Sequence, residues 1–276
     1  MADAAGGGEG GGQATPAMLR VYPDGRRQPI TRPLVPEAPV ALEYNGLAYA
    51  VMMATPADLI DFATGFALTE GLAQTPKDIG EIAVAEVPDG WIIRTNLAGL
   101  GIEKLTDRVR ARVADSSCGL CGIENLAAVN QPLPRVAPHK AIAPAAIFAA
   151  LAALPAHQTL GQSTGAAHAA AFAAPDGAIT QLREDVGRHN AMDKLIGAMA
   201  RAGASLYPGF VLSTARCSYE IVEKAVRAGA TTLVTVSLPT TLAVTRARAA
   251  GLSLWSLARG DSVLMVVDGS FEGVEA

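Results

Sequence analysis

The sequence has few cysteines, few aromatic residues and few charges. Only three of its 276 residues are cysteine, which is too few for a disulfide framework and leaves at least one thiol unpaired. Charged residues make up 17% of the chain, and the formal net charge is -4. Nucleic-acid binding in general needs a basic face that displaces counterions from phosphates, so this balance argues against it. A small anionic ligand is still compatible, because a few local arginines can outweigh the overall sign.

The sequence also lacks a secretion signal and a membrane-spanning stretch. Residues 1–18 are rich in glycine and alanine and have neither the basic start nor the apolar run of a signal peptide. We expect this tail to be disordered. No stretch is long enough to cross a bilayer without charge, proline or glycine. We therefore expect a cytoplasmic protein that does not bind membranes, in a compartment that keeps its thiols reduced.

Residues 19–113 are predicted to form a small α+β unit. Asn45-Gly46 separates two strand-like runs, PVALEYN and LAYAVMMA, which is a strong hairpin signal. A helix is expected from Pro56 to Gly71, with Thr55 as its N-cap, because its apolar residues recur on one face. Two more strands, IAVAEV and GWIIRTNL, are expected to turn at Pro88-Asp89-Gly90.

Residues 114–276 are predicted to form a second domain in which strands and helices alternate. An alanine-rich helix should begin at Pro144, and a hairpin should turn at Pro175-Asp176-Gly177. A helix from about Asn190 follows, and then the strands GFVLS, TTLVTVS, LSLWSLA and SVLMVV, with helices between the first three. This alternation implies βαβ units on a mixed, mainly parallel sheet. The predicted fold class is therefore α/β, with the smaller α+β unit before it.

The alternation also predicts where a ligand would bind. In sheets of this kind, ligands bind beyond the carboxyl ends of the strands. The segments expected there are Glu184–His189, Thr214–Arg216, Ser237–Thr240 and Leu257–Ser262. Arginines lie on or beside these segments, so we expect a cationic edge that suits phosphates or carboxylates. They are Arg183, Arg188, Arg216 and Arg259.

Cys118 and Cys121 form a CxxC pair in the segment SSCGLCG. Such a pair can be half of a zinc site, a redox dithiol or a nucleophilic sulfur carrier. Zinc needs two more ligands, and the sequence has no second CxxC. A thioredoxin-like pair opens a helix directly after a strand, whereas a glycine follows each cysteine here. Exposed thiols between glycines suit a carrier that attacks a donor persulfide, and a structural loop with two buried thiols is the plain alternative.

Histidines occur in two contrasting contexts. His168 lies in the alanine-rich run STGAAHAAAF, where a histidine is more often a hydrogen-bonded core residue than a catalyst. The segment EDVGRHN, which ends at Asn190, is expected at a strand-to-helix turn. Helix capping in a solvated loop explains Asp185 and Asn190, but it does not explain Arg188 and His189 together. These two side chains are therefore candidates for a functional site.

REDVGRHNAMDKLIG, at residues 183–197, together with SSCGLCG resembles the formate dehydrogenase accessory sulfurtransferases, the FdhD family. Agreeing segments span residues 45–262. The chain departs from the family pattern in two places. Ala215 and Cys217 stand where the family usually has a glycine and a small apolar residue, and LAR at Leu257–Arg259 replaces the more usual Phe-Ala-Arg.

The resemblance implies a sulfurtransferase that takes persulfide sulfur from a cysteine desulfurase. It would pass this sulfur to the bis-molybdopterin guanine dinucleotide cofactor before the cofactor enters the catalytic subunit of formate dehydrogenase. Cys118 matches the persulfide-bearing residue, with Cys121 as an auxiliary thiol. The resemblance also implies a homodimer and a cytidine-deaminase-like three-layer sandwich. The family's cofactor-binding stretch matches Leu257, Ala258, Arg259, Gly260, Asp261 and Ser262.

Two other functions compete with sulfur transfer. A zinc-dependent deaminase needs a His-x-Glu motif and a Pro-Cys-x-x-Cys motif. The sequence has no His-x-Glu, and Ser117 precedes Cys118, so we exclude deamination and expect no metal ion bound by the protein. A non-catalytic chaperone that binds only the guanine dinucleotide cofactor is the other alternative, and only the cysteine pair favours transfer over it. The sequence leaves open the partner desulfurase and dehydrogenase, the dimer interface, whether Cys121 is essential, and the roles of His168, Arg188, His189 and Cys217.

Overall fold

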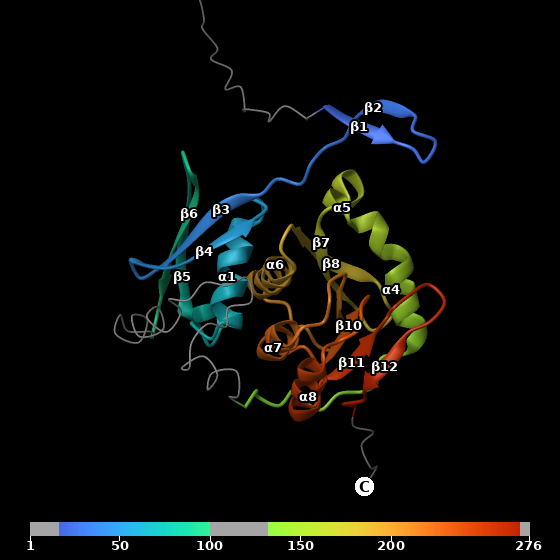
Figure 1. Ribbon diagram of the computed structural model, residues 1–276. Helices are drawn as coiled ribbons and strands as arrows, with labels where there is room; N and C mark the ends of the chain where they lie inside the picture. Colours follow the sequence, from blue (N-terminus) through green and yellow to red (C-terminus); the bar gives the residue numbers. More distant parts are fainter. Residues whose placement is uncertain (1–16, 100–131, 271–276) are drawn as a thin grey trace, which may run out of the picture. The chain divides into compact units, whose positions relative to one another are not determined.

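The computed structural model describes residues 17–99 and 132–270 (Figure 1). The chain divides into two compact units, Met1–Leu34 and Val35–Ala276. The described part of the first unit is an antiparallel pair of strands, β1 (Ala17–Val21) and β2 (Arg27–Thr31). The expected domain boundary between residues 113 and 114 lies outside the described residues.

A four-stranded sheet and one helix occupy the first part of the second unit. The strands are β3 (Ala38–Tyr44), β4 (Leu47–Ala54), β5 (Ile79–Val87) and β6 (Gly90–Leu97), in the order β4-β3-β6-β5. The central pair β3–β6 is parallel and the outer pairs are antiparallel hairpins, as predicted. Asn45 and Gly46 have φ values of 49° and 80°, so both adopt the left-handed conformation that a tight hairpin turn requires. A short 3-10 helix, η1 (Pro76–Asp78), precedes β5.

Helix α1 (Leu59–Thr69) packs its aromatic side chains against this sheet, but it begins later than predicted. Its N-cap is Asp58, and the expected cap at Thr55 is wrong. The Thr55 backbone N–H donates to Asp185 Oδ2 at 3.0 Å, and the Thr55 hydroxyl accepts from the Val186 N–H at 3.1 Å. Thr55 is therefore held by a distant part of the chain rather than by its own helix.

The second sheet has six strands in the described residues. They are β7 (His168–Ala173), β8 (Ile179–Asp185), β9 (Phe210–Ser213), β10 (Thr232–Thr235), β11 (Ser253–Ser256) and β12 (Leu264–Val267), in the order β12-β11-β10-β9-β7-β8. The sheet is mixed, as predicted, but parallel pairing is confined to β9–β10 and β10–β11. The β7–β8 and β11–β12 pairs are antiparallel, because their connections are too short for the crossover that a parallel pair needs. Strand β7 also pairs antiparallel with β9.

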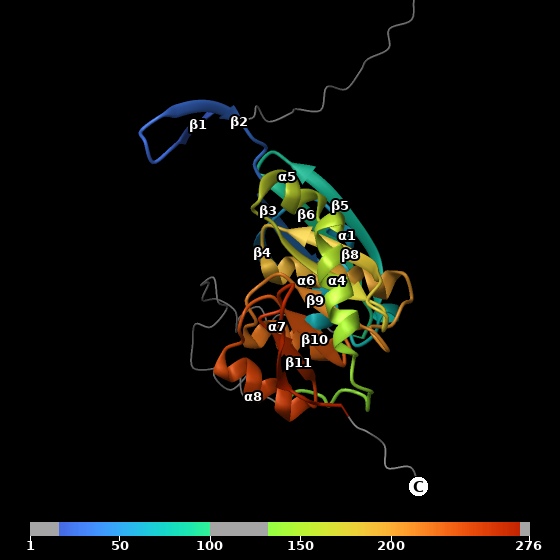
Figure 2. The ribbon, with the colours of Figure 1, turned by 90° about the vertical axis from the view of Figure 1, so that its right-hand side faces the viewer.

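Helices cover both faces of the six-stranded sheet (Figure 1 and Figure 2). Alternate residues along the strands pack on α6 (Arg188–Arg201), α7 (Tyr219–Arg227) and α8 (Thr241–Ala250) on one face. On the other face they pack on α4 (Pro144–His157), which is followed by the short helix α5 (Thr159–Thr164). The sheet and its helices thus form three layers. Within the described ranges, no helix combines the length and the apolar character needed to cross a membrane.

The two sheets are joined through a helix pair, α1 and α6, whose backbones touch. A Cβ atom on Gly65 would lie 1.7 Å from the Asp193 carbonyl oxygen, and one on Gly197 would lie 1.8 Å from the Asp61 carbonyl oxygen. Only glycine fits at either position, because any side chain would have to occupy the space of the facing backbone. The four-stranded sheet is therefore fixed directly to the helix that begins at Arg188.

Candidate functional site

The strongest candidate site lies where β8 leads into α6. Asp185 ends β8, and Arg188 is the first residue of the helix. The N-cap is Gly187, which has no side chain with which to cap the first turn. A helix of 14 residues carries a partial positive charge at its N-terminus, and uncapped first-turn amides are suited to binding anions. Arg188 adds a full positive charge at the same place.

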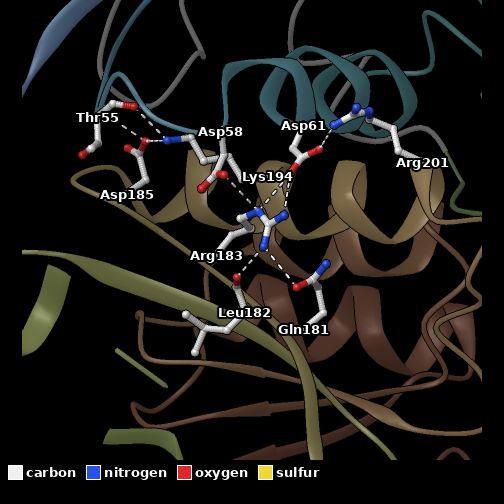
Figure 3. Close-up of polar contacts among 9 residues, drawn as sticks. All are labelled: Thr55, Asp58, Asp61, Gln181, Leu182, Arg183, Asp185, Lys194 and Arg201. Carbon is white, nitrogen blue, oxygen red and sulfur yellow. Dashed lines mark hydrogen bonds and ion pairs between the residues drawn. The ribbon is translucent and has the colours of Figure 1, made fainter. Parts of the chain in front are cut away.

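The Asp185 carboxylate, which is fully buried, fixes the shape of this turn. Its Oδ1 atom accepts hydrogen bonds from the Gly187 backbone N–H at 2.7 Å and from Asn190 Nδ2 at 3.0 Å. Its Oδ2 atom accepts from the Thr55 N–H and forms an ion pair with Lys194 Nζ at 2.6 Å (Figure 3). Lys194 is also fully buried and donates to the Thr55 carbonyl at 2.8 Å. Asp185 and Asn190 do stabilise the helix start, but in the interior rather than in a solvated loop.

Two polar atoms beside this turn lack partners. Among the described residues, Arg188 Nε and His189 Nε2 are buried and have no hydrogen-bond partner. His189 Nε2 lies 3.7 Å from a Glu220 carboxylate oxygen, which is an ion-pair distance rather than a hydrogen bond. Burial raises the pKa of Glu220, but its neighbours His189 and Ser218 lower it to about 2. A buried donor without a partner is costly, so Arg188 Nε is suited to donating to an anion at this turn.

His168 and Arg216 lie at the same edge of the sheet. His168 is the first residue of β7 and pairs in register with Asp185. Its pKa lies below the ordinary value because of burial and, after that, the positive charges of Arg188 and Arg216. Both arginines therefore act electrostatically on His168, which agrees with the prediction that they lie at one edge. It places His168 half-buried at the cationic edge rather than in the core.

The segment Leu257–Ser262 lies beyond the carboxyl end of β11, as predicted. Leu257 has a φ of 49°, a left-handed conformation that is strained for a branched side chain and that recurs at functional sites. The Ala258 N–H donates to the Thr235 carbonyl at 3.2 Å, and the Arg259 N–H donates to the Ser262 carbonyl at 2.8 Å. The Arg259 side chain is exposed. Since β11 is two strands from β9, this segment is about 10 Å from the end of β9 along the edge.

Arg183, in contrast, does not belong to the open edge. Its guanidinium binds Asp61 on α1 through Nε at 2.9 Å and Nη2 at 2.7 Å, and its Nη1 donates to Gln181 and to the Leu182 carbonyl (Figure 3). Arg201, at the end of α6, contacts the other oxygen of Asp61 at 2.5 Å. The expectation that Arg183 joins the anion site is therefore wrong, because its guanidinium is bound to Asp61 and holds β8 against α1.

Of the three cysteines, the structure describes Cys217. Cys118 and Cys121 lie outside the described residues, so their predicted roles stay predictions. Cys217 is completely buried between α6, α7 and α8, and burial raises its pKa to about 12 despite a hydrogen bond with Thr235. At neutral pH Cys217 is a thiol, which is a poor nucleophile. In residues 17–99 and 132–270, no three His, Cys, Asp or Glu side chains converge as metal ligands.

A hollow lies at the opposite end of α6, where it faces α1 and β5. Apolar side chains line it together with Lys77 and Arg201. Arg201 is already paired with Asp61. At 1.5 Å per residue, α6 separates this hollow from Arg188 by about 20 Å. The buried Arg188 Nε, which has no hydrogen-bond partner in the described residues, therefore makes the carboxyl edge the better candidate.

Comparisons with known proteins agree with the resemblance seen in the motifs. The model of the FdhD/NarQ family matches residues 35–268. A sulfur carrier protein FdhD from Chromobacterium violaceum is 46% identical over 239 residues, which cover 86% of this chain and 88% of that protein. The sulfur carrier protein FdhD from Variovorax paradoxus is 42% identical over 229 residues, covering 83% and 82% of the two chains.

A solved structure has a similar fold, which supports the mixed α/β class. It is the crystal structure of a protein from Desulfotalea psychrophila described as a candidate formate dehydrogenase accessory protein. The TM-score is 0.71 at 23% identity, and the match covers 91% of this chain and 95% of the other. The match of the family model over most of the sequence, together with these relatives, decides the family. This chain belongs to the FdhD/NarQ family.

Proposed function

We propose that this protein is a sulfur carrier for formate dehydrogenase. It takes persulfide sulfur from a cysteine desulfurase onto Cys118 and delivers it to bis-molybdopterin guanine dinucleotide, before this cofactor enters the dehydrogenase catalytic subunit. The cofactor is the substrate, held at the cationic edge. The observation that carries the proposal is the uncapped start of α6, where the buried Arg188 Nε has no hydrogen-bond partner in the described chain.

The chemistry of the cationic edge suits the diphosphate of a guanine dinucleotide. A planar guanidinium can bind two phosphate oxygens at once, and Arg188 and Arg216 lie close enough to act together on His168. The first-turn amides of α6 add donors that favour negative charge. The strained turn at Leu257–Ser262 offers Arg259 from the far end of the same edge. These features support binding of the cofactor through its phosphates.

Sulfur transfer to Cys118 needs no outside oxidant. The Cys118 thiolate attacks the terminal sulfur of the donor's persulfide, the donor's S–S bond breaks, and the donor cysteine leaves as a thiolate. Cys118 then carries the persulfide, and Cys121 can assist its release or protection. The buried thiol of Cys217, with its pKa of about 12, is unsuited to this attack. The protein would act in the reducing cytoplasm, as a homodimer and without a metal ion of its own.

Mass spectrometry tests the sulfur-carrying step. The protein is incubated with a cysteine desulfurase and cysteine, digested without reductant, and searched for the added mass of one sulfur atom. We expect it on the peptide with Cys118, its loss in Cys118→Ala, and its retention in the matched variant Cys217→Ala. Added sulfur that is unchanged in Cys118→Ala would contradict the proposal.

The alternative is a chaperone that binds the cofactor without carrying sulfur, because the cationic edge would serve both functions. A strain without its own copy of the protein separates them, with formate oxidation as the readout. A carrier predicts that Cys118→Ala abolishes activation of the dehydrogenase and that Cys121→Ala retains part of it. Full activation by Cys118→Ala would favour the chaperone.

A further inference from the structure

We propose that Asp185 is a positioning residue of the anion site: its buried carboxylate, held by Lys194 and Thr55, sets the turn that presents Arg188 to a phosphate. This inference rests on the proposed function, since it assigns a role within the site at the start of α6. It concerns a residue that need not touch the ligand.

Several contacts meet at the Asp185 carboxylate. Oδ1 accepts from the backbone of Gly187, directly before Arg188, and from the side chain of Asn190 in the first turn of α6. Oδ2 faces Thr55 and Lys194, which belong to the β4–α1 connection and to the second turn of α6. Asp185 thus joins the strand end, the helix start and the neighbouring sheet at a single point.

Thr55 supports the same turn from the other side. Its hydroxyl accepts from the Val186 N–H at 3.1 Å, and its own N–H and carbonyl bind Asp185 and Lys194. Both backbone amides of the Val186-Gly187 turn are therefore fixed by this small network. A turn fixed at both amides leaves the direction of Arg188 little freedom, and sites need such support to stay within a fraction of an ångström.

The negative charge of Asp185 is also needed at this position. Asp185 and Lys194 are both completely buried, and an ion pair of this kind adds little net stability over apolar residues of similar size. An asparagine at position 185 would keep one acceptor oxygen. Its NH2 group, however, would face other donors, such as the Thr55 N–H and the Lys194 ammonium. The network could not close around it. Only a carboxylate satisfies all four donors.

Helix α6 provides a matched control. Asp193 is also buried and accepts from Lys224 through both oxygens at 2.9 Å, and from the Thr69 hydroxyl at 2.7 Å. This pair joins α1, α6 and α7 two turns further along, away from the anion site. Asp185→Asn and Asp193→Asn therefore remove the same charge from the same helix region, one beside Arg188 and one apart from it.

Calorimetry with GDP and with guanosine tests the inference. We expect Asp185→Asn to weaken GDP binding at least about tenfold, as misplaced binding groups do, while guanosine binding is unchanged because it lacks the phosphates. Asp193→Asn should lower the melting temperature at least as much and leave both affinities unchanged. If Asp185→Asn does not fold, the milder Thr55→Val decides. It removes the acceptor of the Val186 N–H and should weaken GDP binding selectively.

The outcomes separate this inference from the proposed function. Absence of GDP binding to the wild type, or equal binding by wild type and Arg188→Ala, would contradict the anion site itself and the inference with it. Loss of affinity in Arg188→Ala with unchanged affinity in Asp185→Asn, or in Thr55→Val if that variant decides, would overturn the positioning role alone. An equal loss of GDP and guanosine binding would also overturn it, because a general loss of structure would explain both.

Discussion

The seam between α1 and α6 and the carboxyl edge of the six-stranded sheet use charged residues in opposite ways. At the seam each charge has a partner: Arg183 and Arg201 bind Asp61, and Lys224 binds Asp193. At the edge, Arg188 Nε and His189 Nε2 are buried without a hydrogen-bond partner in the described chain, and Arg259 is exposed. Paired charges join the two sheets, whereas the edge holds arginines whose donors suit an anion.

This difference predicts that the seam controls stability and the edge controls binding. The strongest test is Lys224→Met, which leaves the Asp193 carboxylate buried with the Thr69 hydroxyl as a remaining donor. Removing one partner of a buried pair costs about 3–5 kcal/mol, so the free energy of unfolding in urea should fall by that order. Arg188→Ala is the matched change at the edge, and its free energy of unfolding should stay near that of the wild type. A large loss in Arg188→Ala would contradict the division.

The glycine contact gives the next largest effect. Gly65→Ala forces a methyl group into the Asp193 carbonyl, so the two helices have to move apart. Overpacking in an interior costs about 1–3 kcal/mol and sometimes more, and we expect the upper end because the obstacle is backbone. Gly260→Ala is the control, because a Cβ there has no atom within 4 Å. Equal thermal stability of the two variants would mean that α1 and α6 can move apart at no cost in stability.

Arg259→Ala tests the far end of the edge. Losing one charge-assisted contact should weaken GDP binding by about 1.5–3 kcal/mol, roughly ten- to a hundredfold in affinity. Calorimetry of the wild type and the variant measures this directly, with melting temperatures to show that both are folded. Equal affinities would place the phosphates nearer to Arg188 and Arg216, and would leave Arg259 as a solvated residue.

The sequence predicts local features of this fold better than it predicts hydrogen bonds between residues that are far apart in the chain. The hairpins at Asn45-Gly46 and at Pro175-Asp176-Gly177 are confirmed, because each depends on backbone chemistry within a few residues. Thr55 is misassigned as a helix cap because its hydrogen-bond partner Asp185 is 130 residues away. Arg183 is misplaced at the open edge for the same reason, since its partner Asp61 is 122 residues away.

The candidate site shows the same limit. Arg188 and Arg216 could be placed at one edge from the strand–helix alternation alone, because the topology decides where strands end. The pairing of Lys194 with Asp185 and the position of Glu220 beside His189 follow from tertiary packing, and no local pattern predicts them. The roles of Cys118 and Cys121 depend on the family motif, and these residues lie outside the described ranges.

The smallest expected effect is the pH dependence of the edge, and it depends on His168. Its pKa in the folded protein is lowered by burial and by Arg188 and Arg216, so the folded state takes up a proton less readily than the unfolded chain. Its contribution to stability is therefore complete above the ordinary histidine pKa of about 6.5, and it is lost as the pH falls through the lower folded value. A bound diphosphate should offset the arginine charges and raise the pKa of His168, so GDP binding should take up protons.

Calorimetry in buffers of different ionisation enthalpy measures this proton uptake. The phosphate of GDP also titrates, with a pKa of about 6. The variant His168→Gln measures the proton uptake of the phosphate alone, because it keeps the size of the side chain and removes the titration of the imidazole. We expect the wild type to take up more protons than His168→Gln on binding GDP, and its unfolding free energy to fall more steeply as the pH decreases below neutrality. Equal proton uptake by the two proteins would mean that the phosphates bind out of reach of His168, at the Arg259 end of the edge.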